Sequence, residues 1–306
     1  MASEKKRGPW AEKYLLPLLV RLVRALPHGA ALIFGAFMGN VLWLFSKRRV
    51  DRAERRCVAA LGVGVTPARE IVRASYAGMG RSAVEFARMR QLLPRLRDLI
   101  SIEGKEYLDG ALARGRGALV MTAHLGNWEL AGARLVAEGY PVTPIYTPQR
   151  NRGGVNDLIE RERSEAAGFN LVPSRGPGLR EAFRTLRERG ILFFLQDLDA
   201  RREGLLVPFL GIPASTAIGI VKMHRKFGAP IVPMVTLRNP DGYRHTIQVQ
   251  KILSDFPDED GEPFGTNMAK SLQMCNNILS DWVAKYPDQW MWLLDRWGSV
   301  EKEKRR

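Results

Sequence analysis

Cysteine, histidine and acidic residues are all scarce in this chain of 306 residues. It has 2 cysteines and 4 histidines, and 32 Asp and Glu stand against 47 Lys and Arg, for a net charge of +15. The cysteines, Cys57 and Cys275, lie far apart, which excludes a disulfide scaffold and a cysteine-based zinc site and fits a reducing compartment. The positive excess favours an acidic partner, which is nucleic acid, an anionic membrane surface or an acidic carrier protein.

Long hydrophobic runs are rare as well, and a single one covers residues 29–46 without a charge. One run excludes a multi-pass transporter. As a helix it would reach about 27 Å, just short of the ~30 Å hydrocarbon core, so it either spans the bilayer or dips into it. Before it, leucines and valines at helical spacing share residues 10–26 with Lys13, Arg21 and Arg24. That pattern predicts an amphipathic helix in the headgroup region.

A basic segment follows the apolar run. Residues 47–56 hold six Lys and Arg against Asp51 and Glu54, and the positive-inside rule then predicts a cytoplasmic location for everything downstream. Basic residues in place of a small-residue cleavage site argue against a signal peptide. We expect residues 1–60 to form an amphipathic and hydrophobic membrane-attachment region and residues 61–306 to form one catalytic domain. The alternative is a buried core helix followed by a solvated basic helix.

The remainder of the chain alternates between short apolar runs and helical patterns. Strands are predicted at 118–123, 141–147, 169–173, 191–196, 230–237 and 243–253, and helices at 66–93, 128–138, 154–167, 178–189, 216–227 and 267–285. Such alternation predicts an α/β fold, with a mostly parallel central sheet flanked by helices on both faces. Active sites in such sheets collect at the carboxyl ends of the strands.

The stretch GALVMTAHLGNWEL, residues 117–130, places His124 at the carboxyl end of a predicted strand. Glu129 follows five residues later, beyond a short turn and near the start of a helix, so the two side chains are able to face each other. A histidine oriented by a carboxylate is a general base of raised basicity that suits the deprotonation of a hydroxyl. An isolated pair at this spacing is also compatible with a structural histidine and a solvated glutamate.

HLGNWE, residues 124–129, resembles the His-x4-Asp/Glu signature of the lysophospholipid acyltransferases. Within that superfamily the chain resembles the lipid A biosynthesis acyltransferases, which add secondary acyl chains. Four further blocks match in order: DLIERERSEAAG at 157–168, DLD at 197–199, GLLVPFLGIPASTAIG at 204–219 and QWMWLLDRW at 289–297. Leu294 and Asp295 depart from the basic or histidine residues expected there, which leaves the role of this tail open.

The resemblance implies a glycerolphosphate-acyltransferase-like fold that moves a fatty acyl chain to a hydroxyl of a lipid A precursor. Acyl carrier protein is the implied donor, and the implied location is the inner membrane with the catalytic domain on its cytoplasmic face. His124 would take the hydroxyl proton as the oxygen attacks the thioester carbonyl, with Glu129 stabilising the imidazolium. No cofactor, metal or covalent enzyme intermediate is needed.

The developing oxyanion needs hydrogen-bond donors, from backbone N–H groups or an arginine. Arg163 is the first candidate and Arg161 the second, although either could bind an acceptor phosphate or lie on a solvated helix face. Asn127, inside the motif, is assigned to the same substrate side.

Asp197 and Asp199 follow an apolar strand, as in glycosyltransferases that hold a divalent ion. No nucleotide-binding loop accompanies them, so we favour a structural role, paired with Arg201, Arg202 or another arginine. Gly211 belongs to a predicted loop over residues 204–214. That loop either lines the acyl or acceptor pocket or simply connects, and Thr216 would cap the following helix.

Other functions remain open alternatives. Nucleic-acid binding is not expected, because no recognised nucleic-acid module accompanies the charge. The acceptor could instead be a mannosylated phosphoinositide or a lysophospholipid. A metal-dependent glycosyltransferase and a non-catalytic membrane scaffold are further alternatives, and the intact His124 and Glu129 argue against the scaffold. Trp290, Trp292 and Trp297 suit a membrane interface or packing within the domain equally well.

Overall fold

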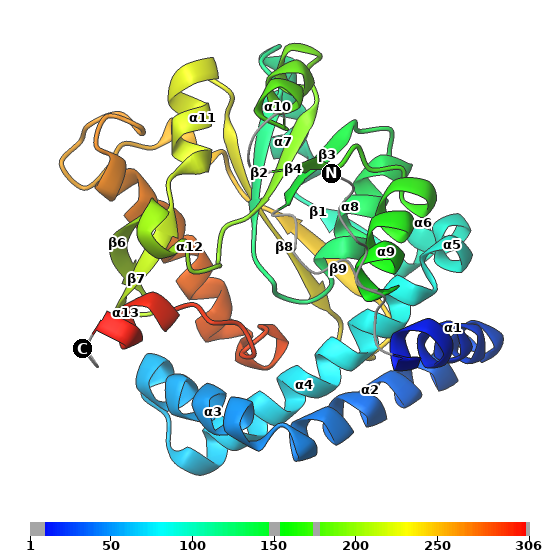
Figure 1. The fold of residues 1–306 in the computed structure, drawn as a ribbon. Coiled ribbons are helices and arrows are strands. Elements are labelled where there is room, and N and C mark those ends of the chain that lie inside the picture. The colour runs from blue at the N-terminus through cyan, green and yellow to red at the C-terminus, as the bar shows by residue number, and fades with distance from the viewer. Residues whose placement is uncertain (1–9, 147–153, 174–177, 304–306) are drawn as a thin grey trace, which may run out of the picture.

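The computed structural model describes residues 10–146, 154–173 and 178–303, and a seven-stranded sheet lies at its centre (Figure 1). The strand order is β1-β9-β8-β2-β5-β3-β4, and neighbours are parallel except for the antiparallel pair β8 and β9. The strands are β1 (Ile100–Glu103), β2 (Ala118–Thr122), β3 (Val142–Tyr146), β4 (Val172–Pro173), β5 (Ile191–Leu195), β8 (Ile231–Arg238) and β9 (His245–Val249). The predicted mostly parallel sheet is confirmed.

Helices cover both faces of the sheet, as the buried side chains of β2 show. Leu119 and Met121 pack in the core that α10, α11 and α12 cover, while Ala118 and Val120 pack in the core beneath α7 and α8. Because successive side chains of a strand point to opposite faces, a strand buried on both sides has a continuous apolar run. These helices are α7 (Lys105–Ala113), α8 (Trp128–Ala137), α10 (Gly178–Arg187), α11 (Gly219–Phe227) and α12 (Met268–Lys285).

Three strands were not predicted. β1 is a four-residue edge strand, and β6 (Gly204–Phe209) and β7 (Ile212–Ala217) form a separate hairpin. Leu210 and Gly211 join β6 to β7 with φ values of 49° and 73°, the left-handed geometry of a tight hairpin turn. The prediction of a loop at 204–214 was therefore wrong, because the alternation of β6 is interrupted by prolines and glycines.

The first four helices form a layer beside the carboxyl ends of the central strands (Figure 1). They are α1 (Trp10–Ala25), α2 (His28–Phe45), α3 (Lys47–Leu61) and α4 (Val65–Ala87). α2 packs along α4 through glycines: a Cβ on Gly35 would lie 2.6 Å from the Gly80 carbonyl oxygen, and one on Gly39 would overlap the Tyr76 carbonyl. Such small residues allow two helix backbones to approach closely.

The outward faces of α1 and α2 are apolar and exposed. Phe45 is 80% exposed, and the same surface contains Tyr14, Leu15, Leu18, Leu19, Leu22, Ile33, Phe37, Met38, Leu42 and Leu44. By length and composition α2 is also a helix able to cross a membrane, with 22% of its residues buried. Contiguous exposed apolar surface of this kind marks an interaction site.

The C-terminal tail packs into the domain. Trp290, Trp292 and Trp297 are buried, so they pack in the core and do not face a membrane interface. Asp295, one of the two departures from the family pattern, pairs with Arg56 of α3, which also donates to Glu301 over 2.7 Å. The tail thus holds α3 against α13 (Gly298–Glu303).

Candidate active site

His124 lies two residues beyond β2 and pairs with Asp197, which lies two residues beyond β5. The register of the parallel strands pairs Thr122 with Leu195, so the two chain positions leave the sheet side by side. Asp197 Oδ1 lies 2.8 Å from His124 Nδ1, and Asp197 Oδ2 accepts the His124 backbone N–H over 2.8 Å. Both oxygens of one carboxylate therefore orient the histidine.

Asp197 is fully buried and remains ionised. Burial by itself would raise its pKa, but the His124 ring, the Trp290 indole N–H at 2.8 Å and the His124 backbone N–H together hold the pKa below its usual range. Because an ionised carboxylate can only accept hydrogen bonds, the His124 Nδ1 that faces it carries the ring proton. The lone pair of His124 is then on Nε2, which is the arrangement a general base requires.

Glu129 does not pair with His124, and the expectation that it orients the histidine was wrong. Its carboxylate accepts the Arg163 Nε–H at 3.0 Å, a second bond from Arg163 Nη2, and the Trp128 indole N–H at 3.0 Å. Glu129 lies one residue into α8, and the side chain is turned towards the π-helical segment Glu162–Ala166 that contains Arg163. His124 and Glu129 nevertheless face the same cavity.

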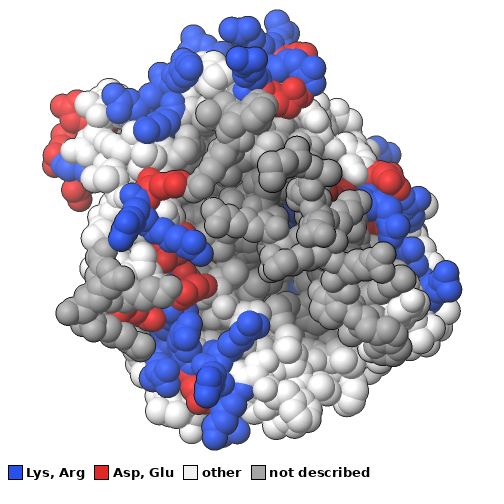
Figure 2. All heavy atoms as spheres, in the orientation of Figure 1, with Lys and Arg blue, Asp and Glu red and all other residues white. Residues whose placement is uncertain are grey.

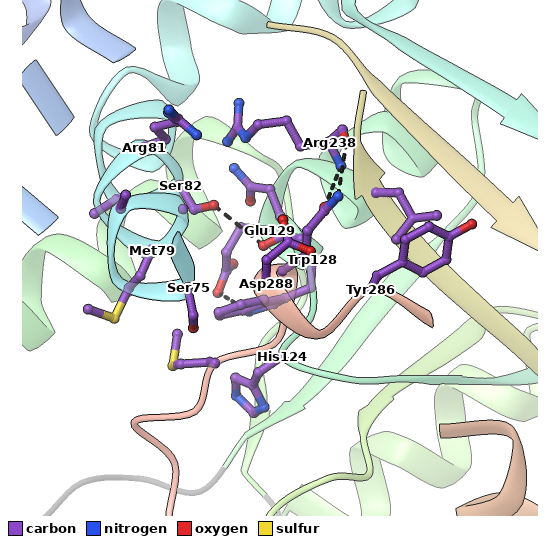
Figure 3. Close-up of a pocket in the computed structure, with 18 of the residues that line it drawn as sticks. Ser75, Met79, Arg81, Ser82, His124, Trp128, Glu129, Arg238, Tyr286 and Asp288 are labelled. Carbon is purple, nitrogen blue, oxygen red and sulfur yellow. Dashed lines mark hydrogen bonds between the residues drawn. The ribbon is translucent and has the colours of Figure 1, made fainter. Parts of the chain in front are cut away.

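That cavity has a volume of about 930 Å³ and lies between α4 and the carboxyl ends of the central strands (Figure 3). The residues predicted for the site that line it are His124, Asn127, Glu129 and Arg163. Its apolar lining includes Met79, Phe86, Ile159, Leu237 and Met291. A largely apolar cavity with a few convergent polar groups is the usual form of a small-molecule or lipid site.

The turn between His124 and α8 is backed by β8. Gly126 has φ of 65°, and a Cβ there would overlap the Thr236 carbonyl oxygen, so only glycine fits this turn. Asn127 caps α8 by accepting the Leu130 N–H over 3.2 Å. The order of strand, short turn and helix is as predicted. Asn127 was assigned to the substrate side, but its buried amide caps α8 and donates to Glu85, so both of its polar groups are used within the fold.

A buried cluster behind the motif was not predicted. Glu85 of α4 accepts from Asn127 Nδ2 at 2.7 Å, Arg238 Nη2 at 2.6 Å and His245 Nε2 at 3.0 Å. Burial would raise the Glu85 pKa, but His245 and Arg238 bring it far below its usual range. Glu85 lies within an ordinary helical pattern, and no local motif signals that its partners come from two distant strands.

The remaining predicted site residues lie outside the cavity. Arg161 is exposed at the end of α9 (Gly154–Arg161) and does not line the cavity. Asp199 accepts the backbone N–H groups of Arg201 at 2.8 Å and Ser299 at 2.7 Å. Its charge also acts on the buried Arg296 guanidinium, whose pKa it raises against the effect of burial, so its role is structural.

Gly211 and Thr216 are also distant from the chemistry. Gly211 is in the β6–β7 turn, and Thr216 is buried inside β7, where its hydroxyl accepts from Arg296 at 2.6 Å and Asn276 at 3.0 Å. The predicted helix cap at Thr216 is wrong, since α11 begins at Gly219 after Ile218.

The sequence match now gives this fold and cavity a class, which is an acyl-transfer enzyme. Residues 7–299 match the bacterial lipid A biosynthesis acyltransferase family. The chain belongs to this family and is an O-acyltransferase.

Similar proteins include members with different acceptors in their names. Phosphatidylinositol mannoside acyltransferase of Mycolicibacterium smegmatis is 27% identical over 295 residues, which cover 94% of this chain and 91% of that protein. Lipid A biosynthesis lauroyltransferase of Escherichia coli is 25% identical over 280 residues, covering 89% and 86%. The solved 1-acyl-sn-glycerophosphate acyltransferase PlsC of Thermotoga maritima is 14% identical, covers 85% of this chain and 96% of that chain, and has a TM-score of 0.36.

Proposed function

We propose that this enzyme transfers a fatty acyl chain from an acyl-carrier-protein thioester to a hydroxyl of a lipid A precursor, with His124 as general base. The observation that carries the proposal is the His124 ring, whose Nδ1 is held by buried Asp197 and which lines a cavity of about 930 Å³. Asp197 here takes the orienting role that sequence reasoning gave to Glu129.

The reaction follows from this geometry. The acceptor hydroxyl gives its proton to His124 Nε2 as its oxygen attacks the thioester carbonyl, and Asp197 stabilises the imidazolium. The tetrahedral oxyanion collapses and expels the carrier thiolate, which takes the same proton back from His124. Atoms and charge balance without an acyl-enzyme.

The oxyanion is stabilised by the start of α8 and by Arg163. The Trp128 and Glu129 side chains line the cavity at the first turn of this helix, whose positive dipole end favours a developing anion. Arg163 is charged, because Glu129 raises its pKa against the opposing effect of burial. The Glu129–Arg163 pair thus positions a cation on the cavity wall.

The enzyme binds the cytoplasmic face of the inner membrane through α1 and α2. Their exposed leucines and phenylalanines form the apolar surface. Exposed basic residues follow directly in α3, and Figure 2 shows Lys and Arg gathered over that helix beside uncharged surface: Lys47, Arg48, Arg49, Arg52 and Arg55. Anionic lipid attracts such a basic flank. Because α2 is packed along α4, the helix lies in one leaflet and its apolar face enters the bilayer.

A phosphatidylinositol mannoside is the second candidate acceptor. The relatives with that name are 27% identical over 93% or more of this chain. Lipid A precursors and phosphatidylinositol mannosides share a sugar hydroxyl and a phosphate on a lipid, so the same base and cavity suit both.

Mass spectrometry of the lipid product tests the reaction. Wild-type enzyme and His124→Ala are incubated with acyl-carrier-protein or coenzyme A thioester and with a tetraacylated lipid A precursor, a phosphatidylinositol mannoside or lysophosphatidic acid. A gain of one acyl chain on the lipid A precursor, from the carrier-protein donor and with wild type alone, supports the proposal. Acylation of another acceptor, or equal turnover by His124→Ala, contradicts it.

Flotation with liposomes of phosphatidylethanolamine and phosphatidylglycerol tests the membrane surface. Phe37→Asp places a charge on α2, where Phe37 is 60% exposed, and should reduce binding at least tenfold. The matched control is Phe256→Asp, because Phe256 is 46% exposed but distant from α1 and α2 in sequence and lies after η4 (Leu253–Asp255). Equal loss of binding in both variants would contradict this docking surface.

A further inference from the structure

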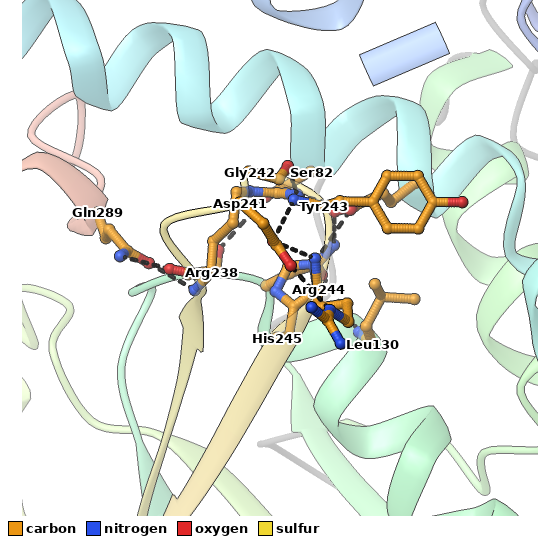
Figure 4. A network of polar contacts seen from close by, with 12 residues as sticks. Ser82, Leu130, Arg238, Asp241, Gly242, Tyr243, Arg244, His245 and Gln289 are labelled. Atoms are coloured by element: carbon orange, nitrogen blue, oxygen red, sulfur yellow. Dashed lines mark hydrogen bonds and ion pairs between the residues drawn. The ribbon is translucent and has the colours of Figure 1, made fainter. Parts of the chain in front are cut away.

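Besides Arg163, the cavity has an arginine on α4, Arg81. Arg81 and Arg238 both line the cavity, and Figure 3 shows them near each other at one end, at the top of the view. Arg81 is one helical turn before Glu85, while Arg238 ends β8. Figure 4 shows the Arg238 backbone held by Gln289, which accepts its N–H over 2.8 Å and donates to its carbonyl over 3.1 Å.

The two arginines differ in their partners. Arg238 donates to Glu85 through Nη1 at 2.8 Å and Nη2 at 2.6 Å, and the same carboxylate accepts from Asn127 and His245. The Glu85 carboxylate thus accepts four hydrogen bonds. Among the residues that the structure describes, Arg81 has neither a hydrogen bond nor an ion pair, although its side chain is partly buried.

Among the residues that the structure describes, no carboxylate of the cavity forms an ion pair with Arg81, and Asp288 is an exposed carboxylate of the same lining. Glu129 is held by Arg163, and Glu103 accepts from Gln248 at 3.3 Å on the exposed rim. Burial and the nearby Arg238 charge lower the pKa of Arg81, and the Glu85 carboxylate opposes them only in part, yet a guanidinium stays protonated in proteins. A partly buried cation with no direct ion-pair partner is stabilised when an anion enters the cavity and accepts its donors.

We propose that Arg81 anchors an anion site that binds a phosphate group of a substrate in this cavity. The proposal rests on the proposed function, and it assigns the phosphate to a residue outside the His-x4-Glu motif. Guanidinium donors form a planar fork that matches two phosphate oxygens. Arg163 is paired with Glu129 beside His124, and Arg238 donates to Glu85. Among the described residues Arg81 makes no side-chain bond, so its donors can meet a phosphate at this other end of the cavity. The phosphate comes from the acceptor headgroup or from the phosphopantetheine arm of the donor.

Binding of inorganic pyrophosphate tests the site without any turnover. Calorimetry compares wild type, Arg81→Gln, Arg81→Lys and Arg69→Gln, the last being a matched charge loss at an exposed position of the same helix outside the cavity. We expect Arg81→Gln to weaken binding about 10- to 100-fold, Arg81→Lys to weaken it less, and Arg69→Gln to bind as wild type does. Equal affinity in wild type and Arg81→Gln, with both folded by circular dichroism, overturns the proposal.

Paired substrates then identify the source of the phosphate. The acceptor pair is a tetraacylated lipid A precursor with two phosphates or with one, and the donor pair is acyl-4′-phosphopantetheine or acyl-pantetheine. Arg81→Gln should raise KM about tenfold or more for the fully phosphorylated member of one pair, with kcat nearly unchanged, and should abolish the difference within that pair. Unchanged KM for both pairs overturns the role in substrate binding. Arg81-dependent pyrophosphate binding in an enzyme that acylates none of these acceptors would instead count against the proposed function alone.

Discussion

Two histidine–carboxylate pairs of similar length occupy different regions of this protein. His124 Nδ1 lies 2.8 Å from Asp197 Oδ1, and His245 Nε2 lies 3.0 Å from Glu85 Oε1. The carboxylates are 0% and 1% exposed, but the His124 side chain keeps 12% exposure where His245 keeps 1%. His124 lines the cavity and His245 does not.

The difference lies in the second ring nitrogen. Nδ1 of His245 is buried, with no hydrogen-bond partner among the residues described, so this ring has no route for a proton to or from a substrate. The His124 ring lines a cavity large enough for a lipid headgroup. A histidine oriented by a carboxylate is thus a base for catalysis only where its other nitrogen meets the substrate, and elsewhere it stabilises the fold.

The largest expected effect separates the two histidines by activity. His124→Ala should lower the rate of acyl transfer about 10²- to 10⁴-fold, because the hydroxyl loses its base, while the protein stays folded with a smaller loss of melting temperature than His245→Ala, since Asp197 keeps the Trp290 and His124 backbone donors. His245→Ala should show the reverse, with a lower melting temperature and retained turnover in the folded fraction. Mass-spectrometric rates and thermal melts measure both. Similar rate losses in the two variants would remove the distinction between the pairs.

Removing the carboxylate of the buried pair should chiefly affect stability. Glu85→Ala leaves Arg238 and His245 without their shared acceptor, and loss of one partner of a buried ion pair costs about 3–5 kcal/mol. Urea unfolding measures this change. The control is Glu165→Ala, which removes an exposed ion pair with Arg90 and should cost about 1 kcal/mol or less. Equal midpoints for the two variants would show that the Glu85 cluster contributes nothing.

Removing the carboxylate of the catalytic pair should chiefly affect turnover. Asp197→Asn retains the shape but cannot stabilise an imidazolium, so kcat should fall about 100-fold with little change in KM. Asp199→Asn is the matched control, because Asp199 holds Ser299 and does not line the cavity. Steady-state kinetics measure kcat and KM for both variants. A wild-type kcat in Asp197→Asn would show that Asp197 does not orient His124 and would favour Glu129 in that role.

Acid should weaken both pairs together. The pKa values of Asp197 and Glu85 are lowered in the folded protein, so each carboxylate contributes stability that is fully present above its unfolded pKa of about 4 and is lost as the pH falls below it. Urea midpoints should therefore be insensitive to these groups between about pH 5 and 8 and decline below about pH 4. Glu85→Gln should flatten that decline. An unaltered decline would place the acid sensitivity in other carboxylates.

The smallest expected effect concerns the cysteines. Burial raises the pKa of the Cys57 and Cys275 thiols to about 12, so neither forms the thiolate that attacks a thioester at neutral pH. Ellman's reagent at pH 7.5 should label the folded protein very slowly and leave acyl transfer intact, whereas the urea-unfolded protein should react with two equivalents. Rapid labelling with loss of turnover would favour an acyl-cysteine route over His124.

Local periodicity was sufficient to predict most of the fold. Apolar runs such as 118–123 and 191–196 coincide with β2 and β5, since a strand buried on both faces must be apolar throughout. The hairpin β6–β7 was missed because its turn depends on positive φ at Leu210 and Gly211, and prolines and glycines in a strand weaken the periodic signal.

The site was predictable in part. The strand-end position of His124 follows from local sequence, and the structure places Arg163 on the cavity wall as expected, whereas the cap formed by Asn127 was not predicted. The pairing of Glu129 was predicted wrongly, because short sequence distance suggested a contact that the direction of α8 prevents. Its partner, Arg163, is 34 residues away.

The sequence by itself determined the family, the strand–helix alternation and the choice of His124 as the candidate base, since these depend on residues within one motif or one period. Only the tertiary structure decided which carboxylate orients that base, because the β2–β5 register brings together residues 73 positions apart. It also decided that Glu85 pairs with Arg238 and, among the described residues, leaves Arg81 without a direct ion-pair partner, because the partners of a buried charge come from distant strands.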